Sequence, residues 1–329
     1  MIYAPVVLCT LNRYEHLKCC LESLKRNAWA SKTELYISVD FPVKESHEKG
    51  YKKVKQYLDQ GLQGFASINI FYQTKNLGPD DNYKYIKERA FEKYDRIILT
   101  EDDNEFSPHF LEYVDRLLEK YEGDDTVFAV SGYNYLQNWK DKGEGILKLD
   151  NIFSAYGCGL WRKKEKDFIY AIEKQNMDSM MKQWKIVSYI SKKNPAAFNN
   201  LISCYLGTNR IMKDTQGYFK PTDSVRGIYM LASKKCIVVP KVSQVLNHGF
   251  DGSGVNCTCD VETDAMKKKE TEVRKEWDKD EERNYSDRLV MLSYNSRKVR
   301  KMMGNNWRHF CVNWFHYLLY QMGLKMPSE

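Results

Sequence analysis

Short apolar runs alternate with amphipathic stretches along the first part of the chain. The runs are too brief for helices and predict strands of a sheet, and the run over 97–99, which shows no polar alternation, predicts a strand buried on both faces. The stretches between them repeat apolar residues at helical spacing, as Leu17, Leu21 and Leu24 do in the helix predicted over 14–26. The predicted strands are 5–9, 35–39, 67–72, 97–99 and 127–131. This alternation predicts a doubly wound, mostly parallel α/β sheet with right-handed crossovers and flanking helices.

The pattern after residue 131 is less regular. The stretch 133–152 is polar and contains glycines, so it predicts a loop. Gly157 and Gly159 follow among aromatic residues, and they allow either a close approach of the backbone to a ligand or a tight turn in a β-ribbon. Later segments predict helices over 164–215 and 225–232, a strand over 236–240 and a glycine-rich loop over 247–254.

The last part of the chain differs in character. Residues 260–288 are dense in charges of both signs, which predicts a solvated helix or loop. Residues 297–325 begin with a basic cluster and then repeat tryptophan and other apolar residues at helical spacing. A basic, tryptophan-bearing amphipathic helix can lie in a membrane interface, and the alternative is a helix packed on the rest of the protein.

Three consecutive acids, Glu101, Asp102 and Asp103, follow the strand predicted over 97–99. A parallel sheet binds ligands just outside the carboxyl ends of its strands, so these acids lie where a ligand is expected. The acids repel one another unless a positive group lies among them, and a divalent cation bridging to phosphate oxygens meets that need. The alternative is a solvated acidic turn before a helix. Further polar residues follow the other strands at the same edge: Thr10, Asn12, Arg13, Asp40, Lys75 and Asn76.

Charge and composition narrow the function classes. The net charge of +7 suits an anionic ligand or a membrane surface, and the lack of an aromatic-basic repeat predicts no nucleic-acid partner. Neither G-x-G-x-x-G nor G-x-x-x-x-G-K-[ST] occurs, which disfavours dinucleotide oxidoreductases and P-loop phosphotransferases. Without a signal peptide or an apolar run of roughly 20 residues, a cytoplasmic protein with reduced cysteines is expected. Cys257 and Cys259 are close, but no second Cys or His pair lies nearby at zinc spacing.

Residues 5–13 and the helix predicted after them are similar to the start of family-two-type nucleotide-sugar glycosyltransferases, which have the GT-A fold. Glu101-Asp102-Asp103, with the residues that follow, is similar to the metal-binding motif of animal N-acetylglucosaminyltransferase I. The segments around Asp223 and over 239–254 resemble bacterial sugar transferases that build surface polysaccharides. The resemblance covers roughly residues 3–258 and implies a GT-A fold.

The resemblance implies a Mn²⁺- or Mg²⁺-dependent site for a nucleotide-diphosphate sugar, with a UDP-sugar as the expected donor. It implies that Asp103 binds the metal, that Asp102 lies near the ribose or donor sugar, and that Glu101 braces the site. The remaining implied donor contacts are Thr10, Asn12, Arg13 and Asp40 to the nucleoside, and Lys75 and Asn76 to the diphosphate or ribose. His248 is implied as a second metal ligand, and the alternative is a loop histidine hydrogen-bonded to backbone.

For catalysis, the resemblance implies inversion at the anomeric carbon, with a carboxylate that takes the proton from the acceptor hydroxyl. Asp223 aligns with the catalytic acidic position of these enzymes, although Thr222 stands where they usually have tryptophan. Glu144, Asp150 and Asp214 are rival positions. The implied acceptor is a glycan or a lipid-linked molecule in capsular or other surface polysaccharide synthesis.

The expected organisation is a GT-A domain over 1–258 and a C-terminal extension over 259–329. Within the domain, 1–131 is the expected nucleotide-binding half and 132–258 the acceptor half. Peripheral contact with the inner face of a membrane is the expectation for 297–325 if that helix is interfacial.

Two other functions stay open. A sugar nucleotidyltransferase also binds Mg²⁺ through acids on an α/β sheet, but it usually carries a glycine- and basic-rich loop after the first strand, and residues 10–13 are not such a loop. A nucleotide-sugar-binding protein that has lost catalysis is the other alternative, and the intact acid triplet disfavours it.

Overall fold

The structure is a computed structural model that describes residues 2–135, 146–150, 152–206, 219–254, 263–277, 290–292 and 307–324. Its strands are β1 (Val6–Thr10), β2 (Glu34–Val39), β3 (Ser67–Tyr72), β4 (Arg96–Glu101), β5 (Asn104–Phe106), β6 (Val127–Ser131), β7 (Ile146–Leu149), β8 (Cys158–Trp161), β9 (Cys236–Pro240), β10 (Val245–Asn247) and β11 (Val290–Leu292). Its α-helices are α1 (Tyr14–Lys25), α2 (Glu45–Asp59), α3 (Gly78–Lys93), α4 (Phe110–Lys120), α5 (Arg162–Ala171), α6 (Lys174–Met181), α7 (Trp184–Lys193), α8 (Pro195–Tyr205), α9 (Asp223–Ser233), α10 (Asp264–Trp277) and α12 (Trp307–Gln321).

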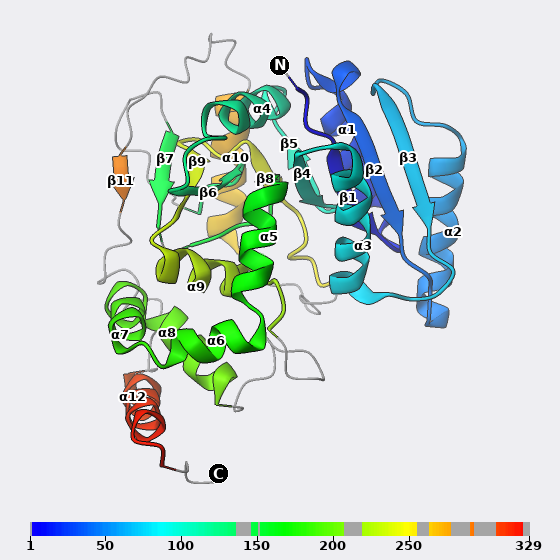
Figure 1. The fold of residues 1–329 in the computed structure, drawn as a ribbon. Helices are drawn as coiled ribbons and strands as arrows, with labels where there is room; N and C mark the ends of the chain where they lie inside the picture. The colour runs from blue at the N-terminus through cyan, green and yellow to red at the C-terminus, as the bar shows by residue number, and fades with distance from the viewer. Residues whose placement is uncertain are drawn as a thin grey trace.

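The main sheet has the strand order β11-β7-β9-β6-β8-β4-β1-β2-β3. Strands β4, β1, β2 and β3 pair in parallel, and β8 runs antiparallel between β4 and β6. Strands β5 and β10 form a separate antiparallel pair. This mostly parallel sheet with flanking helices confirms the predicted α/β class (Figure 1).

Helices cover both faces of the sheet, which explains why central strands such as β1 are continuously apolar. Along β1, Val6 and Leu8 belong to the core that includes α1, α2 and α4. The intervening Val7 and Cys9 belong to the core on the other face, with α3, α5 and α9. Both faces of the strand are therefore buried, and the polar residues that follow it come at its carboxyl end.

One prediction from the middle of the chain is wrong. Residues 146–149 fall in the stretch predicted as a loop, but they form β7, which pairs with β9. Gly157 and Gly159 lie against α4, because an added Cβ would lie 2.7 Å from Phe110 Cε2 at Gly157 and 2.8 Å from Val114 Cγ1 at Gly159. Helix α4 can lie this close to β8 only where side chains are missing. The helical prediction over 164–215 is confirmed in its described part, as the separate helices α5 to α8.

Helix α12 packs one side against α8, at the end of the molecule where the chain terminates (Figure 1). The ring centroids of Phe310 and Trp314 lie 5.3 and 4.9 Å from that of Phe198. Asn313 Nδ2 also donates a hydrogen bond of 3.0 Å to Asn199 Oδ1. The packed-helix alternative therefore holds for this side of α12. Within the described residues, no helix is both long enough and apolar enough to span a bilayer.

Candidate active site

Parallel pairing brings two strand ends together at the edge where the acids lie. Strands β1 and β4 pair with Cys9 opposite Glu101, so Thr10 and Asp102 follow at the same end. Thr10 Oγ1 donates a hydrogen bond of 2.7 Å to Asp102 Oδ2. The predicted meeting of these strand ends is confirmed.

Arg13 supplies the positive charge at this edge. Its Nη1 donates to Asp103 Oδ2 at 2.8 Å, and its Nη2 donates to Asp102 Oδ1. Asp102 and Asp103 are only 3% and 5% exposed, and burying carboxylates is costly unless they are paired and hydrogen-bonded. The guanidinium therefore holds both acids in fixed orientations from just before α1.

The end of β10 and the loop that follows it lie against Asp103. Asn247 Nδ2 donates a hydrogen bond of 2.8 Å to Asp103 Oδ1, and His248 N donates one of 2.9 Å to the Asp103 carbonyl oxygen. A Cβ added at Gly249 would lie 2.3 Å from Asp103 Oδ2. The loop can therefore lie against this carboxylate only because residue 249 is glycine.

Asp223 adds a fourth carboxylate to the three at the end of β4. It is the first residue of α9, and its Oδ2 accepts a hydrogen bond of 3.2 Å from Ala155 N. Burial raises the pKa of Asp223 to about 6. Burial and then the charges of Asp103, Asp223 and Asp102 raise the pKa of Glu101 to about 8. The structure therefore brings the predicted catalytic acid close to the predicted metal-binding acids, although they lie far apart in the sequence.

The cluster fits a hard divalent cation. Glu101, Asp102, Asp103 and Asp223 carry four acidic groups, and Arg13 is the cation that pairs with two of them. Burial, and after it the charges of the other three acids, keep the pKa of Glu101 raised. Oxygen donors with uncompensated charge are what Mg²⁺ and Mn²⁺ prefer, so these residues suit either ion.

The residues predicted to hold the nucleoside lie at the same edge, but Asp40 has a structural task as well. Its carboxylate accepts hydrogen bonds from the backbone N–H groups of Leu77 and Gly78, at 2.8 and 3.0 Å, where α3 begins. Asn76 Nδ2 also donates to it at 3.2 Å. The roles of Thr10, Asn12, Arg13, Asp40, Lys75 and Asn76 in donor binding stay predictions.

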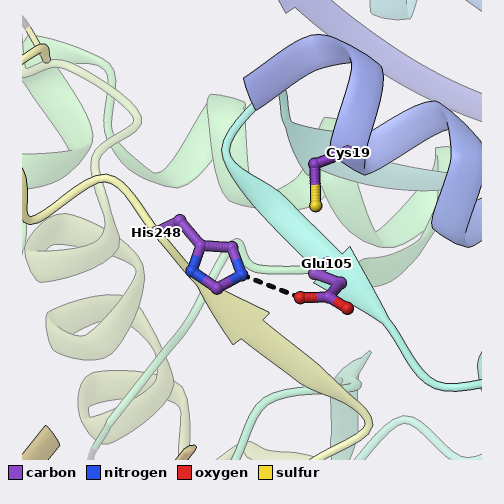
Figure 2. A group of neighbouring side chains, drawn as sticks. All are labelled: Cys19, Glu105 and His248. Atoms are coloured by element: carbon purple, nitrogen blue, oxygen red, sulfur yellow. Dashed lines mark hydrogen bonds and ion pairs between the residues drawn. The ribbon is translucent and has the colours of Figure 1, made fainter. Parts of the chain in front are cut away.

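The His248 side chain points toward Glu105, and Cys19 lies nearby (Figure 2). His248 Nε2 and Glu105 Oε2 are 2.9 Å apart, and Arg274 of α10 donates to both Glu105 oxygens at 2.7 and 2.5 Å. Although burial opposes it, these hydrogen bonds lower the pKa of Glu105 to about 2. A cation among these three residues would have to compete with the Arg274 guanidinium. The role of His248 as a ligand beside Asp103 stays a prediction.

Of the three rival catalytic acids, the structure describes only Asp150. Asp150 Oδ2 lies 3.6 Å from Lys193 Nζ of α7, so its charge is compensated there. Glu144 and Asp214 lie outside the described residues, as do Cys257 and Cys259.

The residues that support the acids carry little signal in the sequence. Asn247 stands in the glycine-rich loop already noted, next to His248, and that position could have suggested it. Glu165, Lys87 and Arg226 form a buried ion-pair network below Asp223, with N–O distances of 2.6 to 2.8 Å. Charged residues in amphipathic helices are usually exposed, so no local pattern distinguishes these three.

Comparison with known proteins finds one family model that matches this chain. The model described as glycosyl transferase family 2 matches residues 6–193. No curated protein matches the sequence.

Solved structures give weaker similarities. The crystal structure of S. aureus TarS 1-349 is 11% identical, with a TM-score of 0.35 over 50% of this chain and 49% of that chain. A second S. aureus TarS structure is 11% identical, with a TM-score of 0.34 over 50% of this chain and 29% of that one. A crystal structure of GalNAc-T7 with UDP, GalNAc and Mn²⁺ is 14% identical, with a TM-score of 0.31 over 48% of this chain and 25% of that one. The chain thus spans about half the length of the first of these structures and less of the others.

Proposed function

The chain belongs to glycosyl transferase family 2, and from this premise we propose that it is a metal-dependent, inverting glycosyltransferase. The proposed donor is a nucleotide-diphosphate sugar, specifically a UDP-sugar, and the proposed acceptor is a hydroxyl of a glycan or lipid-linked molecule in surface polysaccharide synthesis. One observation carries the proposal: buried Asp223 lies close enough to Glu101, at the carboxyl end of β4, for their charges to interact, and this supports a base near the proposed metal site.

Asp103 is the proposed ligand of Mn²⁺ or Mg²⁺, with Asp102 beside it. When bound, the cation would stabilise the negative charge that develops on the departing diphosphate. Arg13 and Asn247 orient the Asp103 carboxylate through hydrogen bonds of 2.8 Å each. Thr10 and Arg13 do the same for Asp102.

Asp223 is the proposed general base. In its ionised form, the carboxylate takes the proton of the acceptor hydroxyl while that oxygen forms a bond to the anomeric carbon. The bond from the anomeric carbon to the diphosphate oxygen breaks on the opposite face, and its electron pair leaves with the diphosphate. Attack and departure on opposite faces invert the configuration. The Ala155 N–H, which donates to Asp223 Oδ2, orients the base.

Calorimetric titration with UDP-, GDP- and dTDP-sugars, each with and without Mn²⁺, tests the donor assignment. We expect one UDP-sugar to bind, and only when the metal is present. Sugar transfer to water or to a glycan acceptor, followed by product analysis, then separates a transferase from a protein that only binds the donor. Formation of a sugar nucleotide from a sugar phosphate and a nucleoside triphosphate would favour the nucleotidyltransferase instead. A folded sample that binds none of the donors would contradict the proposal.

We also propose peripheral contact with a membrane through residues 297–325. Large apolar side chains of α12 are exposed, among them Trp307, Phe315 and Leu318, at 60%, 55% and 43%. Residues 289–328 contain no Asp or Glu. Their basic residues are Arg297, Lys298, Arg300, Lys301, Arg308 and Lys325. Exposed apolar residues together with positive charge favour an anionic bilayer surface.

Liposome flotation tests this contact. The full chain is expected to float with vesicles that contain phosphatidylglycerol, and less so at high salt because the charge attraction is screened. The double variant Phe315→Glu and Leu318→Glu should lose most of this binding, since it places two charges on the apolar side of α12. Ile169→Glu is the matched control, because Ile169 is also exposed, at 40%, but lies on α5. If the double variant floats as well as the unmodified chain, α12 is not the contact.

A further inference from the structure

A buried carboxylate joins three helices beneath the candidate active site. Glu165 of α5 accepts a hydrogen bond of 2.6 Å from Lys87 Nζ of α3, and two of 2.6 and 2.8 Å from Arg226 of α9. The exposed fractions of the three side chains are 6%, 10% and 3%. Burying charged groups costs desolvation free energy, and a buried ion pair adds little stability compared with apolar residues of similar size. The presence of this network therefore needs an explanation other than stability.

The network fixes an orientation as well as a distance. The two parallel hydrogen bonds from Arg226 to Glu165 use the planar fork of the guanidinium, which permits little rotation. The guanidinium also lies 4.4 Å from the ring centroid of Phe168 and 5.2 Å from that of Phe153. Arg226 is therefore held by hydrogen bonds and by aromatic packing.

Arg226 lies in the first turn of α9, three residues after the proposed base. The Arg226 N–H donates to the Thr222 carbonyl oxygen at 2.9 Å, and Asp223 is the residue at which the helix begins. A shift of Arg226 would move this turn and the Asp223 carboxylate with it.

The other end of the network leads to the acids of β4. Tyr83 lies one turn before Lys87 on α3, and its hydroxyl donates a hydrogen bond of 2.9 Å to the Thr100 carbonyl oxygen. Thr100 directly precedes Glu101. A continuous chain of contacts therefore runs from the end of β4 through α3 and Glu165 to the helix that carries Asp223.

We propose that Glu165 is a positioning residue that, through Lys87 and Arg226, sets the place of Asp223 relative to the acids at the end of β4. This role rests on the proposed function, because it assigns Asp223 as the base. Reacting groups must be aligned closely, and a misplacement of about 1 Å can cost about a hundredfold in rate.

Lys87→Met is the most informative variant, because it cuts the connection to α3 and leaves a balanced Glu165–Arg226 ion pair in the core. We expect a folded protein whose Kd for the UDP-sugar and Mn²⁺ is unchanged, while kcat falls by about tenfold to a hundredfold. The matched control is Lys93→Met on the same helix. Lys93 Nζ also contacts a carboxylate, Glu34 at 2.7 Å, but its side chain is 59% exposed. The control should leave both Kd and kcat unchanged.

Glu165→Asp is the second variant and keeps every charge, but its shorter side chain cannot reach Lys87 and Arg226 together. Like Lys87→Met, it should leave the donor Kd unchanged and lower kcat. It serves as the test if Lys87→Met does not fold. An unchanged kcat in a folded variant would overturn the positioning role, as would a loss of kcat that only follows a weaker donor Kd or a loss of folded protein. The unmodified chain tests the proposed function itself: if it neither binds the donor with metal nor transfers sugar, the proposed function fails. If it does both and the variants keep its kcat, only the positioning role fails.

Discussion

Asp103→Asn should lower kcat/KM for sugar transfer by about three decades, a loss of several kcal/mol of transition-state stabilisation. The amide keeps the size of the side chain but removes the charge that a divalent cation requires. Arg13 and Asn247 would remain near an unchanged backbone, so the fold should persist. Steady-state kinetics over a series of Mn²⁺ concentrations measure the effect, and donor calorimetry should show weaker metal-dependent binding in the same variant.

Asp251→Asn is the matched control for this experiment. Asp251 lies on the same glycine-rich loop and pairs with His16 at 3.2 Å, but its side chain is 46% exposed and makes no ion pair with Arg13. Loss of the Asp251 charge should change the rate of sugar transfer little, because exposed ion pairs contribute little to stability. Near-full turnover by Asp103→Asn with a metal-dependent donor would contradict the assignment of Asp103 as the metal ligand.

Asp223→Asn should also cost about two to four decades in kcat, the usual contribution of a general base. Its donor affinity should stay close to that of the unmodified chain, because the base acts on the acceptor hydroxyl. Asp264→Asn is the control, since Asp264 likewise begins a helix but is exposed on α10. A similar loss of kcat in both variants would mean that the effect comes from removing a charge at a helix terminus and not from removing a general base.

The pH profile gives the same assignment a second test. Burial raises the pKa of Asp223 to about 6 from the ordinary range of aspartate, and the base works only when it is ionised. Activity should therefore rise as the pH increases toward 6 and level off above it. A bound cation would favour the ionised carboxylate and move this rise to lower pH. The rise should vanish in Asp223→Asn, and a profile identical to that of the unmodified chain would assign it to another group.

The pattern of apolar residues was sufficient to predict the core of the fold. Strands β1, β2, β4 and β6 are short and mostly apolar because both of their faces are covered, and that burial leaves a signal in consecutive residues. Strand β7 was missed because it has only four residues and follows a polar stretch. Gly157 and Gly159 were open to two interpretations because the sequence does not show that α4 lies against them.

The sequence by itself determined a mostly parallel α/β sheet and the place of Glu101, Asp102 and Asp103 at a strand end. Both follow from local periodicity and from the general rule that parallel strands present their carboxyl ends to ligands. Only the tertiary structure decided that Asp223 joins these acids, that Asn247 holds Asp103 and that Glu165 connects α3 to α9. These contacts join residues far apart in the chain, and they arise from the packing of whole elements, for which neighbouring residues carry no periodic signal.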